Sequence, residues 1–185
     1  MQLNLPTFLT LLRIALIPVF VGVFFLPFRG ANLLCTALFG LAALTDWLDG
    51  YLARRLDQTS AFGAFLDPVA DKLMVAAALV LLVQAIPTRL MAVTAMIIIG
   101  REIAISALRE WMAQIGGHGR VAVSMIGKIK TTAQMVAVLL LLYREPLGGF
   151  FPTLAVGQGL LLIAAVLTLW SMLHYLLAAW PVLKA

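Results

Sequence analysis

The chain has 185 residues, of which 63% are hydrophobic and 11% are charged. Soluble domains are close to half apolar and about a quarter charged, so this composition excludes an ordinary soluble globule and a disordered chain. Lysine and arginine outnumber aspartate and glutamate by 13 to 8, which gives a net charge of +5. In so apolar a chain this surplus indicates cytoplasmic loops beside anionic headgroups, and we expect membrane lipids as partners and no nucleic acid.

Six apolar stretches follow one another along the chain, and each reaches the length of about 20 residues that a helix needs to cross a membrane. The breaks between them are short and contain proline, glycine and polar residues that favour turns. The stretches cover residues 8–26, 32–56, 62–86, 88–115, 124–143 and 153–177. The sequence therefore predicts an all-α integral membrane protein with six transmembrane helices, formed by residues 1–185 as a single membrane domain.

The basic residues fall mainly at one set of the predicted helix ends. Because positively charged residues are retained in the cytoplasm, we expect the richer side, and with it both termini, to face the cytoplasm. The richer side has Arg13, Arg54, Arg55, Lys72, Arg101, Arg109, Arg120, Lys128, Lys130 and Lys184, and the other has Arg29, Arg89 and Arg144.

Five of the predicted helices carry a charged residue at a similar depth. About 13 to 15 residues, or roughly 20 Å of helix, separate each of them from the outer end of its helix. A charge at this depth costs about 2.5–3.5 kcal/mol unless it is paired or hydrated. We therefore expect the five side chains to face one polar cavity that opens to the cytoplasm. They are Arg13, Asp46, Asp71, Arg101 and Lys130.

Four aspartates lie on two neighbouring predicted helices. Asp46 and Asp49 are three residues apart, and Asp67 and Asp71 are four apart, so each pair shares one helix face. Four unpaired carboxylates in a low dielectric repel one another strongly, which favours bound cations. Oxygen ligands select Mg²⁺, Mn²⁺ or Ca²⁺ rather than zinc, and a pair of such ions suits phosphoryl transfer.

The spacing of these aspartates and of the small residues between them resembles the signature of the CDP-alcohol phosphotransferase family. Every spacing in the segment agrees with it. The segment reads Asp46-x2-Asp49-Gly50-x2-Ala53-Arg54-x8-Gly63-x3-Asp67-x3-Asp71.

By this resemblance, the four aspartates bind two divalent cations, Mg²⁺ or Mn²⁺, and Asp71 is the general base. The resemblance also implies a binding site for the CDP group of the substrate, with Arg54 at the diphosphate. Glycine and alanine on these helix faces leave room for a ligand to approach the backbone closely. The residues expected around the CDP group are Gly50, Ala53, Arg54 and Gly63.

Further segments resemble the branch of the family that acts on glycerol 3-phosphate. They are Gly100–Ile103, Ser106–Trp111 and Gly127–Gln134, while Leu5–Arg13 is similar to the family's amphipathic N-terminal segment. The resemblance implies transfer of the phosphatidyl group from CDP-diacylglycerol to sn-glycerol 3-phosphate, giving phosphatidylglycerol phosphate and CMP. It also implies a homodimer in the bacterial cytoplasmic membrane, with the active site on the cytoplasmic side.

The basic residues of the fourth and fifth stretches agree with a phosphorylated acceptor. Arg101 and Arg109 are eight residues apart and share one broad helix face, and Lys130 is expected at the depth of Arg101. With Lys128, they form a candidate site for the phosphate of the acceptor. Alternatively, Arg101 balances the carboxylates, while Arg109 and Lys128 lie at the membrane interface.

Two other functions remain open. Within the same family, the acceptor is another alcohol, as in a cardiolipin-forming or an inositol-phosphate reaction. In a different class, the aspartates belong to a divalent-cation transporter, although transport does not explain Arg54 or the basic residues of the acceptor side. Glu102 lies four residues before Ser106 and seven before Arg109, so we expect it to orient one of these two.

Overall fold

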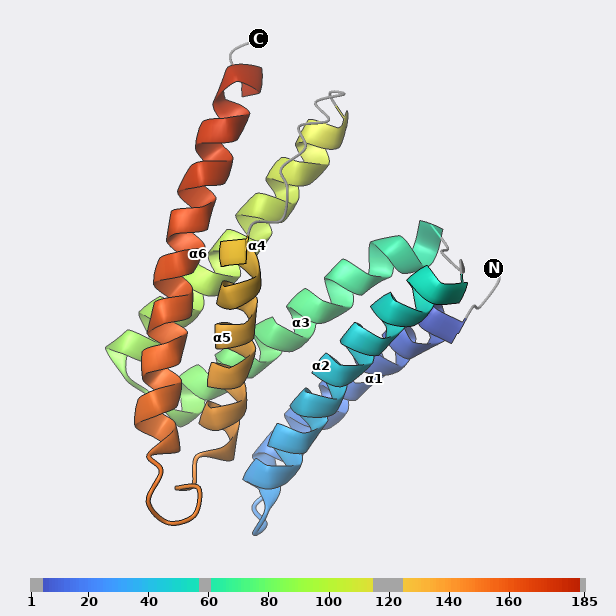
Figure 1. The fold of residues 1–185 in the computed structure, drawn as a ribbon. Helices are drawn as coiled ribbons and strands as arrows, with labels where there is room; N and C mark the ends of the chain where they lie inside the picture. Colours follow the sequence, from blue (N-terminus) through green and yellow to red (C-terminus); the bar gives the residue numbers. More distant parts are fainter. Residues whose placement is uncertain (1–4, 57–60, 115–124, 184–185) are drawn as a thin grey trace.

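The computed structural model describes residues 5–56, 61–114 and 125–183, which form six helices (Figure 1). Within them, the side chains at positions 5–6, 47, 49–56, 61, 64, 109, 113–114, 125–128 and 178–183 are outside the description. The predicted all-helical fold is confirmed, and most helix bounds agree with the predicted stretches to within a few residues. The helices are α1 (Leu5–Phe25), α2 (Ala31–Leu56), α3 (Ala61–Ala85), α4 (Arg89–Gln114), α5 (Met125–Tyr143) and α6 (Thr153–Leu183).

Three of these helices are long and apolar enough to cross a membrane by their length and composition. The spans are Thr7–Phe25, Arg89–Met112 and Thr153–Leu177, while α2 and α5 contain the shorter apolar segments Ala31–Asp46 and Ile129–Tyr143. Many large apolar side chains are exposed on the outer faces of the bundle, as expected for a surface in contact with lipid. The chain is a multi-pass membrane protein, and the number of six spans stays a prediction.

The predicted N-terminal amphipathic segment forms the first turns of α1 itself. Thr7, Thr10 and Arg13 are buried, whereas Phe8 and Leu12 are about half exposed. Polar residues three positions apart therefore face the protein, and the apolar residues between them face outward. This polarity is the reverse of a helix on a soluble protein, because here the outer medium is hydrocarbon.

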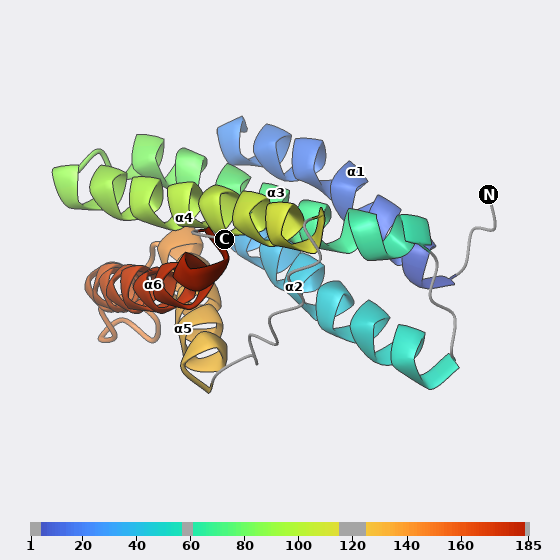
Figure 2. The ribbon, with the colours of Figure 1, turned by 90° about the horizontal axis from the view of Figure 1, so that it is seen from above.

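Helices α4 and α5 both pack against α3 and α6. α1 packs against α2 and α3, α5 runs along α6 and contacts α2, and α4 contacts α3 and α6. Seen from above, α1 lies on one side of the α3 and α4 pair, with α5 and α6 on the other (Figure 2). Within the described ranges, the backbones of α4 and α5 do not pack against each other. Long side chains therefore have to bridge the space between these two helices.

The apolar core lies where the helices cross. Phe20, Phe39, Leu82, Ile98 and Leu141, from five helices, are at most 1% exposed. They bury the inner faces of α1 to α5 and hold the bundle together through close packing. This core lies toward the ends of α1, α3 and α5 and the starts of α2 and α4. The charged residues nearer the opposite helix ends are therefore held by a closely packed frame.

One glycine sets the distance between α5 and α6. A Cβ atom on Gly157 would lie 2.8 Å from Cγ of Leu141 and 3.3 Å from the carbonyl oxygen of Ala137. Close approach of two membrane helices requires a small residue at the point of contact. The absence of a side chain at Gly157 therefore allows α6 to lie against α5 along its length.

The connections between helices are short and locally stabilised. The hydroxyl of Thr88 accepts a hydrogen bond from the backbone N–H of Met91 at 3.1 Å, which caps the start of α4. Arg144, just after α5, has a left-handed backbone with φ of 63° and places its guanidinium 4.8 Å from the ring centre of Phe24. This cation–π contact ties the α5–α6 connection to α1.

The helices alternate in direction. The starts of α1, α3 and α5 lie toward the same end of the bundle as the ends of α2, α4 and α6 (Figure 1). Most of the charged residues of the sequence lie toward this end, whereas Arg29, Arg89, Arg144 and Glu145 lie toward the other. All residues predicted for the site therefore belong to one side of the bundle, although they come from five different helices, α1 to α5.

Candidate active site

A buried arginine on α1 pairs with an aspartate on α2. Arg13 is 1% exposed, and its Nη1 donates a hydrogen bond to Oδ1 of Asp46 at 2.7 Å. Asp46 is 41% exposed, so its carboxylate is both paired and accessible from outside. A guanidinium surrounded by apolar helices needs a counter-charge, and this ion pair joins α1 to α2 at that depth.

The two aspartates of α3 lie one helical turn apart and make different contacts. The hydroxyl of Thr10 donates a hydrogen bond to Oδ1 of Asp67. Asp71 lies close enough to Asp46 and Arg13 for their charges to interact. Arg13 and Asp71 also line the same narrow gap between α1, α2, α3 and α5. Three of the four predicted aspartates are thus gathered around the inward face of α1.

The chemistry of these aspartates fits a hard divalent cation. Within the described residues, one oxygen of Asp46 is bonded to Arg13 and one of Asp67 to Thr10, which leaves their second oxygens and both oxygens of Asp71 for a ligand. Carboxylate oxygens are the ligands that Mg²⁺ and Mn²⁺ prefer. No group of three acidic, histidine or cysteine side chains close enough to hold a metal occurs among the described side chains, and Asp49 lies outside them.

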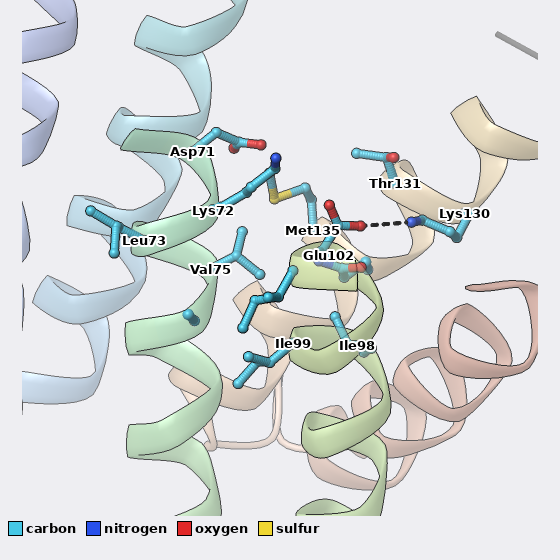
Figure 3. A pocket seen from close by; sticks show the side chains of 13 residues that line it. Asp71, Lys72, Leu73, Val75, Ile98, Ile99, Glu102, Lys130, Thr131 and Met135 are labelled. Atoms are coloured by element: carbon cyan, nitrogen blue, oxygen red, sulfur yellow. Dashed lines mark hydrogen bonds and ion pairs between the residues drawn. The ribbon is translucent and has the colours of Figure 1, made fainter. Parts of the chain in front are cut away.

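A cavity of about 220 Å³ lies between α3, α4 and α5, beside these aspartates (Figure 3). Its apolar wall comes largely from the valine, isoleucine and methionine side chains of the three helices. A mostly apolar cavity with a few convergent polar groups is the usual form of a small-molecule site. The polar lining consists of Asp71, Lys72, Glu102, Lys130, Thr131 and Gln134.

Two buried cations share one carboxylate oxygen at the wall of this cavity. Nη1 of Arg101 donates to Oε1 of Glu102 at 2.8 Å, and Nζ of Lys130 donates to the same oxygen at 3.1 Å. Arg101 is 9% exposed and Lys130 is 5% exposed. Two positive charges beside one negative charge leave a local surplus of one, which is complementary to an anionic ligand.

Two residues of α6 that were not predicted as site residues contact Arg101. Nη2 of Arg101 donates to the hydroxyl of Ser171 at 2.8 Å, and the guanidinium carbon lies 6.0 Å from the ring centre of Tyr175. Ser171 and Tyr175 are four residues apart and share one face of α6. Two polar side chains at that spacing in a mostly apolar helix were the available signal, just as Thr10 was three residues before Arg13.

Glu102 contacts Ser106 through its backbone carbonyl and not through its carboxylate, while Arg109, the other expected partner, lies outside the described side chains. The Ser106 hydroxyl donates to the backbone carbonyl of Glu102 at 2.6 Å and accepts a hydrogen bond from Lys72, which ties α3 to α4. The carboxylate of Glu102 instead binds Arg101 and Lys130, because two buried cations require a negative charge more strongly than a hydroxyl does. The alternative that Arg101 balances the aspartates is not what the structure shows, since its ion pair is with Glu102.

The structure places the five residues of the predicted charged layer in two adjoining groups. Arg13, Asp46 and Asp71 form the first, and Arg101 and Lys130 belong to the second. Asp71 and Lys130 line the same cavity, so the two groups meet there.

The structure describes the side chains of only some of the other predicted site residues. Gly63 is buried on α3, and Asp67 contacts Thr10. The side chains of the remaining candidates lie outside the described residues. They are Asp49, Gly50, Ala53, Arg54, Arg109 and Lys128.

The chain is similar to known proteins over nearly its whole length. A relative from Pectobacterium atrosepticum is 58% identical over 179 residues, which cover 97% of this chain and 96% of the relative. A relative from Sodalis glossinidius is 56% identical over 181 residues, with 97% and 96% covered. A relative from Pseudomonas fluorescens is 54% identical over 185 residues, with 98% and 93% covered. All three are named "CDP-diacylglycerol--glycerol-3-phosphate 3-phosphatidyltransferase".

A family model described as CDP-alcohol phosphatidyltransferase matches residues 3–171. This range contains the whole aspartate signature, the cavity and the two buried cations. The resemblance found in the sequence is therefore confirmed, and the chain belongs to the CDP-alcohol phosphatidyltransferase family.

Proposed function

We propose that this protein transfers the phosphatidyl group of CDP-diacylglycerol to sn-glycerol 3-phosphate, giving phosphatidylglycerol phosphate and CMP. The observation that carries the proposal is the cavity lined by both Asp71 and Lys130, in which Lys130 shares the carboxylate of Glu102 with the buried Arg101. A carboxylate on one side and a basic group on the other suit an acceptor with a hydroxyl at one end and a phosphate at the other. The names of the relatives specify the same acceptor.

The donor side of the site is proposed to be formed by the aspartates of α2 and α3. Asp46, Asp49, Asp67 and Asp71 would hold two divalent cations, Mg²⁺ or Mn²⁺. When bound, these ions neutralise the diphosphate of the donor and stabilise the departing CMP. The signature residues of the same two helices, Gly50, Ala53, Arg54 and Gly63, would bind the CDP group.

On the acceptor side, Arg101 and Lys130 hold the phosphate of glycerol 3-phosphate, and Arg109 and Lys128 are proposed to add to this site. Asp71 accepts the proton of the C1 hydroxyl, and the oxygen forms a bond to the β-phosphorus of the donor. The bond between that phosphorus and the bridging oxygen breaks, and its electron pair leaves with CMP. Holding both reactants in one cavity supplies much of the rate through proximity.

The cellular setting follows from the distribution of charge. We propose that residues 1–185 form one domain in the bacterial cytoplasmic membrane, with both termini and the active site on the cytoplasmic side. A lipid donor and a water-soluble acceptor require a site near that surface, where both have access. A homodimer is proposed from the family resemblance.

The decisive experiment measures CMP release by the purified protein in detergent. CMP is expected to appear only when CDP-diacylglycerol, glycerol 3-phosphate and Mg²⁺ or Mn²⁺ are all present, and to stop when EDTA is added. A panel containing phosphatidylglycerol and inositol phosphate tests the other acceptors, and turnover with one of these alone would overturn the proposed acceptor. Metal uptake into proteoliposomes without the CDP-lipid would instead support a cation transporter.

A further inference from the structure

The carboxylate of Glu102 is divided between two environments. Its Oε1 accepts hydrogen bonds from both Arg101 and Lys130. Its other oxygen, Oε2, has no hydrogen-bond partner among the described residues, and the side chain is 27% exposed at the wall of the cavity. Figure 3 shows one oxygen directed at Lys130 and the other directed away from it. One half of the group therefore organises the cations, and the other half faces the ligand space.

A carboxylate in a phosphate-binding cavity weakens the binding of the phosphate, so we expect it to have a role that outweighs this effect. Its negative charge repels the phosphate dianion that the neighbouring cations attract. Neutralising the two cations uses only Oε1. A strong acceptor left facing a mostly apolar cavity is unfavourable unless a donor binds to it. A hydroxyl group of the ligand is such a donor.

The order of polar groups along the cavity matches the order of groups in the acceptor. Figure 3 shows Glu102 between Asp71 and Lys130, and the charges of Asp71 and Lys130 both interact with it. In glycerol 3-phosphate, the C2 hydroxyl likewise lies between the nucleophilic C1 hydroxyl and the phosphate on C3. When the phosphate binds Arg101 and Lys130 and the C1 hydroxyl meets Asp71, the C2 hydroxyl meets Glu102.

We propose that Glu102 is a specificity residue whose free carboxylate oxygen accepts a hydrogen bond from the C2 hydroxyl of the acceptor. This inference rests on the proposed function. Glu102 thereby selects a phosphorylated diol whose second hydroxyl is next to the nucleophilic hydroxyl. An acceptor with a ketone at C2 has only an oxygen acceptor to present, so it meets the carboxylate with repulsion and leaves it without a donor.

The test compares glycerol 3-phosphate with dihydroxyacetone phosphate, which retains the primary hydroxyl and the phosphate but has a ketone at C2. The wild-type protein is expected to have a kcat/KM roughly ten- to a hundredfold higher for glycerol 3-phosphate, since a hydrogen bond to a charged group has that effect. In Glu102→Gln, the amide oxygen turns to the two cations and the amide N–H₂ faces the cavity. The amide can then donate to a ketone, so the ratio of the two kcat/KM values is expected to fall at least about tenfold.

This ratio separates specificity from a structural role. Both acceptors are measured on the same preparation. A loss of folded protein therefore lowers both kcat/KM values equally and cancels in their ratio. If Glu102 only holds Arg101 and Lys130 in place, Glu102→Gln lowers both values without changing the ratio, and the proposal is overturned. Where Glu102→Gln has too little turnover to measure, the ratio of the dissociation constants of the two acceptors, measured by calorimetry for both proteins, is compared instead.

Glu110→Gln is the matched control, because Glu110 lies on the same helix and is exposed outside the cavity. It is expected to keep the wild-type ratio. A wild-type protein that uses both acceptors equally well overturns the specificity role and leaves the proposed function intact. A wild-type protein that releases no CMP with either acceptor overturns the proposed function itself.

Discussion

The guanidinium of Arg13 on α1 lies 2.7 Å from a carboxylate oxygen of Asp46 on α2, and Arg13 is buried while Asp46 is 41% exposed. The pair is therefore anchored in the protein on one side and open to the site on the other. It fixes the first aspartate of the signature against α1. It also places a positive charge next to carboxylates that would otherwise repel one another.

Replacing this arginine is expected to destabilise the protein. Arg13→Met keeps the length of the side chain but leaves Asp46 without its partner. Breaking a buried ion pair costs about 3–5 kcal/mol, and because Asp46 is partly exposed we expect about 2–3 kcal/mol. Thermal unfolding in detergent measures the loss. Arg29→Met, at an exposed arginine in the α1–α2 connection, is the control and is expected to unfold like the wild type; equal stability of both variants would contradict the role of the pair.

Asp71→Asn is expected to remove turnover while leaving the fold and the binding of the CDP-lipid largely intact. The amide has the same size as the carboxylate but cannot accept the proton of the acceptor hydroxyl. General-base catalysis contributes about 10²- to 10⁴-fold, and we expect a loss of kcat in that range. CMP release and binding of labelled CDP-diacylglycerol are the two measurements. Turnover close to that of the wild type would exclude Asp71 as the base.

Lys130→Met is expected to weaken the binding of one substrate far more than the other. Lys130 lines the cavity and shares Glu102 with Arg101, so its removal lowers the positive charge at the acceptor phosphate. A hydrogen bond between charged groups is worth about 1.5–3 kcal/mol, or roughly ten- to a hundredfold in the KM for glycerol 3-phosphate. The KM for CDP-diacylglycerol is expected to change little.

Steady-state kinetics with each substrate varied in turn checks this difference. Arg89→Met removes an exposed basic residue at the other end of the bundle and serves as the control. An equal rise of both KM values in Lys130→Met would show that the lysine supports the whole site rather than the acceptor.

Gly157→Ala is expected to destabilise the contact between α5 and α6. The new methyl group would lie 2.8 Å from Leu141, so one of the helices has to move. Overpacking of this kind costs about 1–3 kcal/mol. Gly159→Ala is a matched control on the same helix, since a Cβ atom there meets nothing within 4 Å. If both variants melt at the same temperature, the close approach at Gly157 is not important for stability.

Much of the site could be predicted because apolar helices make charged residues conspicuous. Arg13, Asp46, Asp71, Arg101 and Lys130 stand out in stretches that otherwise favour lipid, and the cost of a charge there implies that they face one another. Other site residues were not predicted, because a hydroxyl group adds little to the free energy of inserting a helix into a membrane and its spacing alone does not identify its partner. These residues are Thr10, Ser171 and Tyr175.

The sequence by itself determined the helices, their approximate ends, the acidic signature and the family, because these depend on local composition and on spacing along the chain. Only the tertiary structure decided that Arg13 belongs to Asp46, that Ser171 supports Arg101, and that Glu102 joins Arg101 to Lys130. These pairings depend on how far each helix is rotated and shifted against its neighbours. That rotation is set by packing contacts such as Gly157 against Leu141, which link residues far apart in the chain.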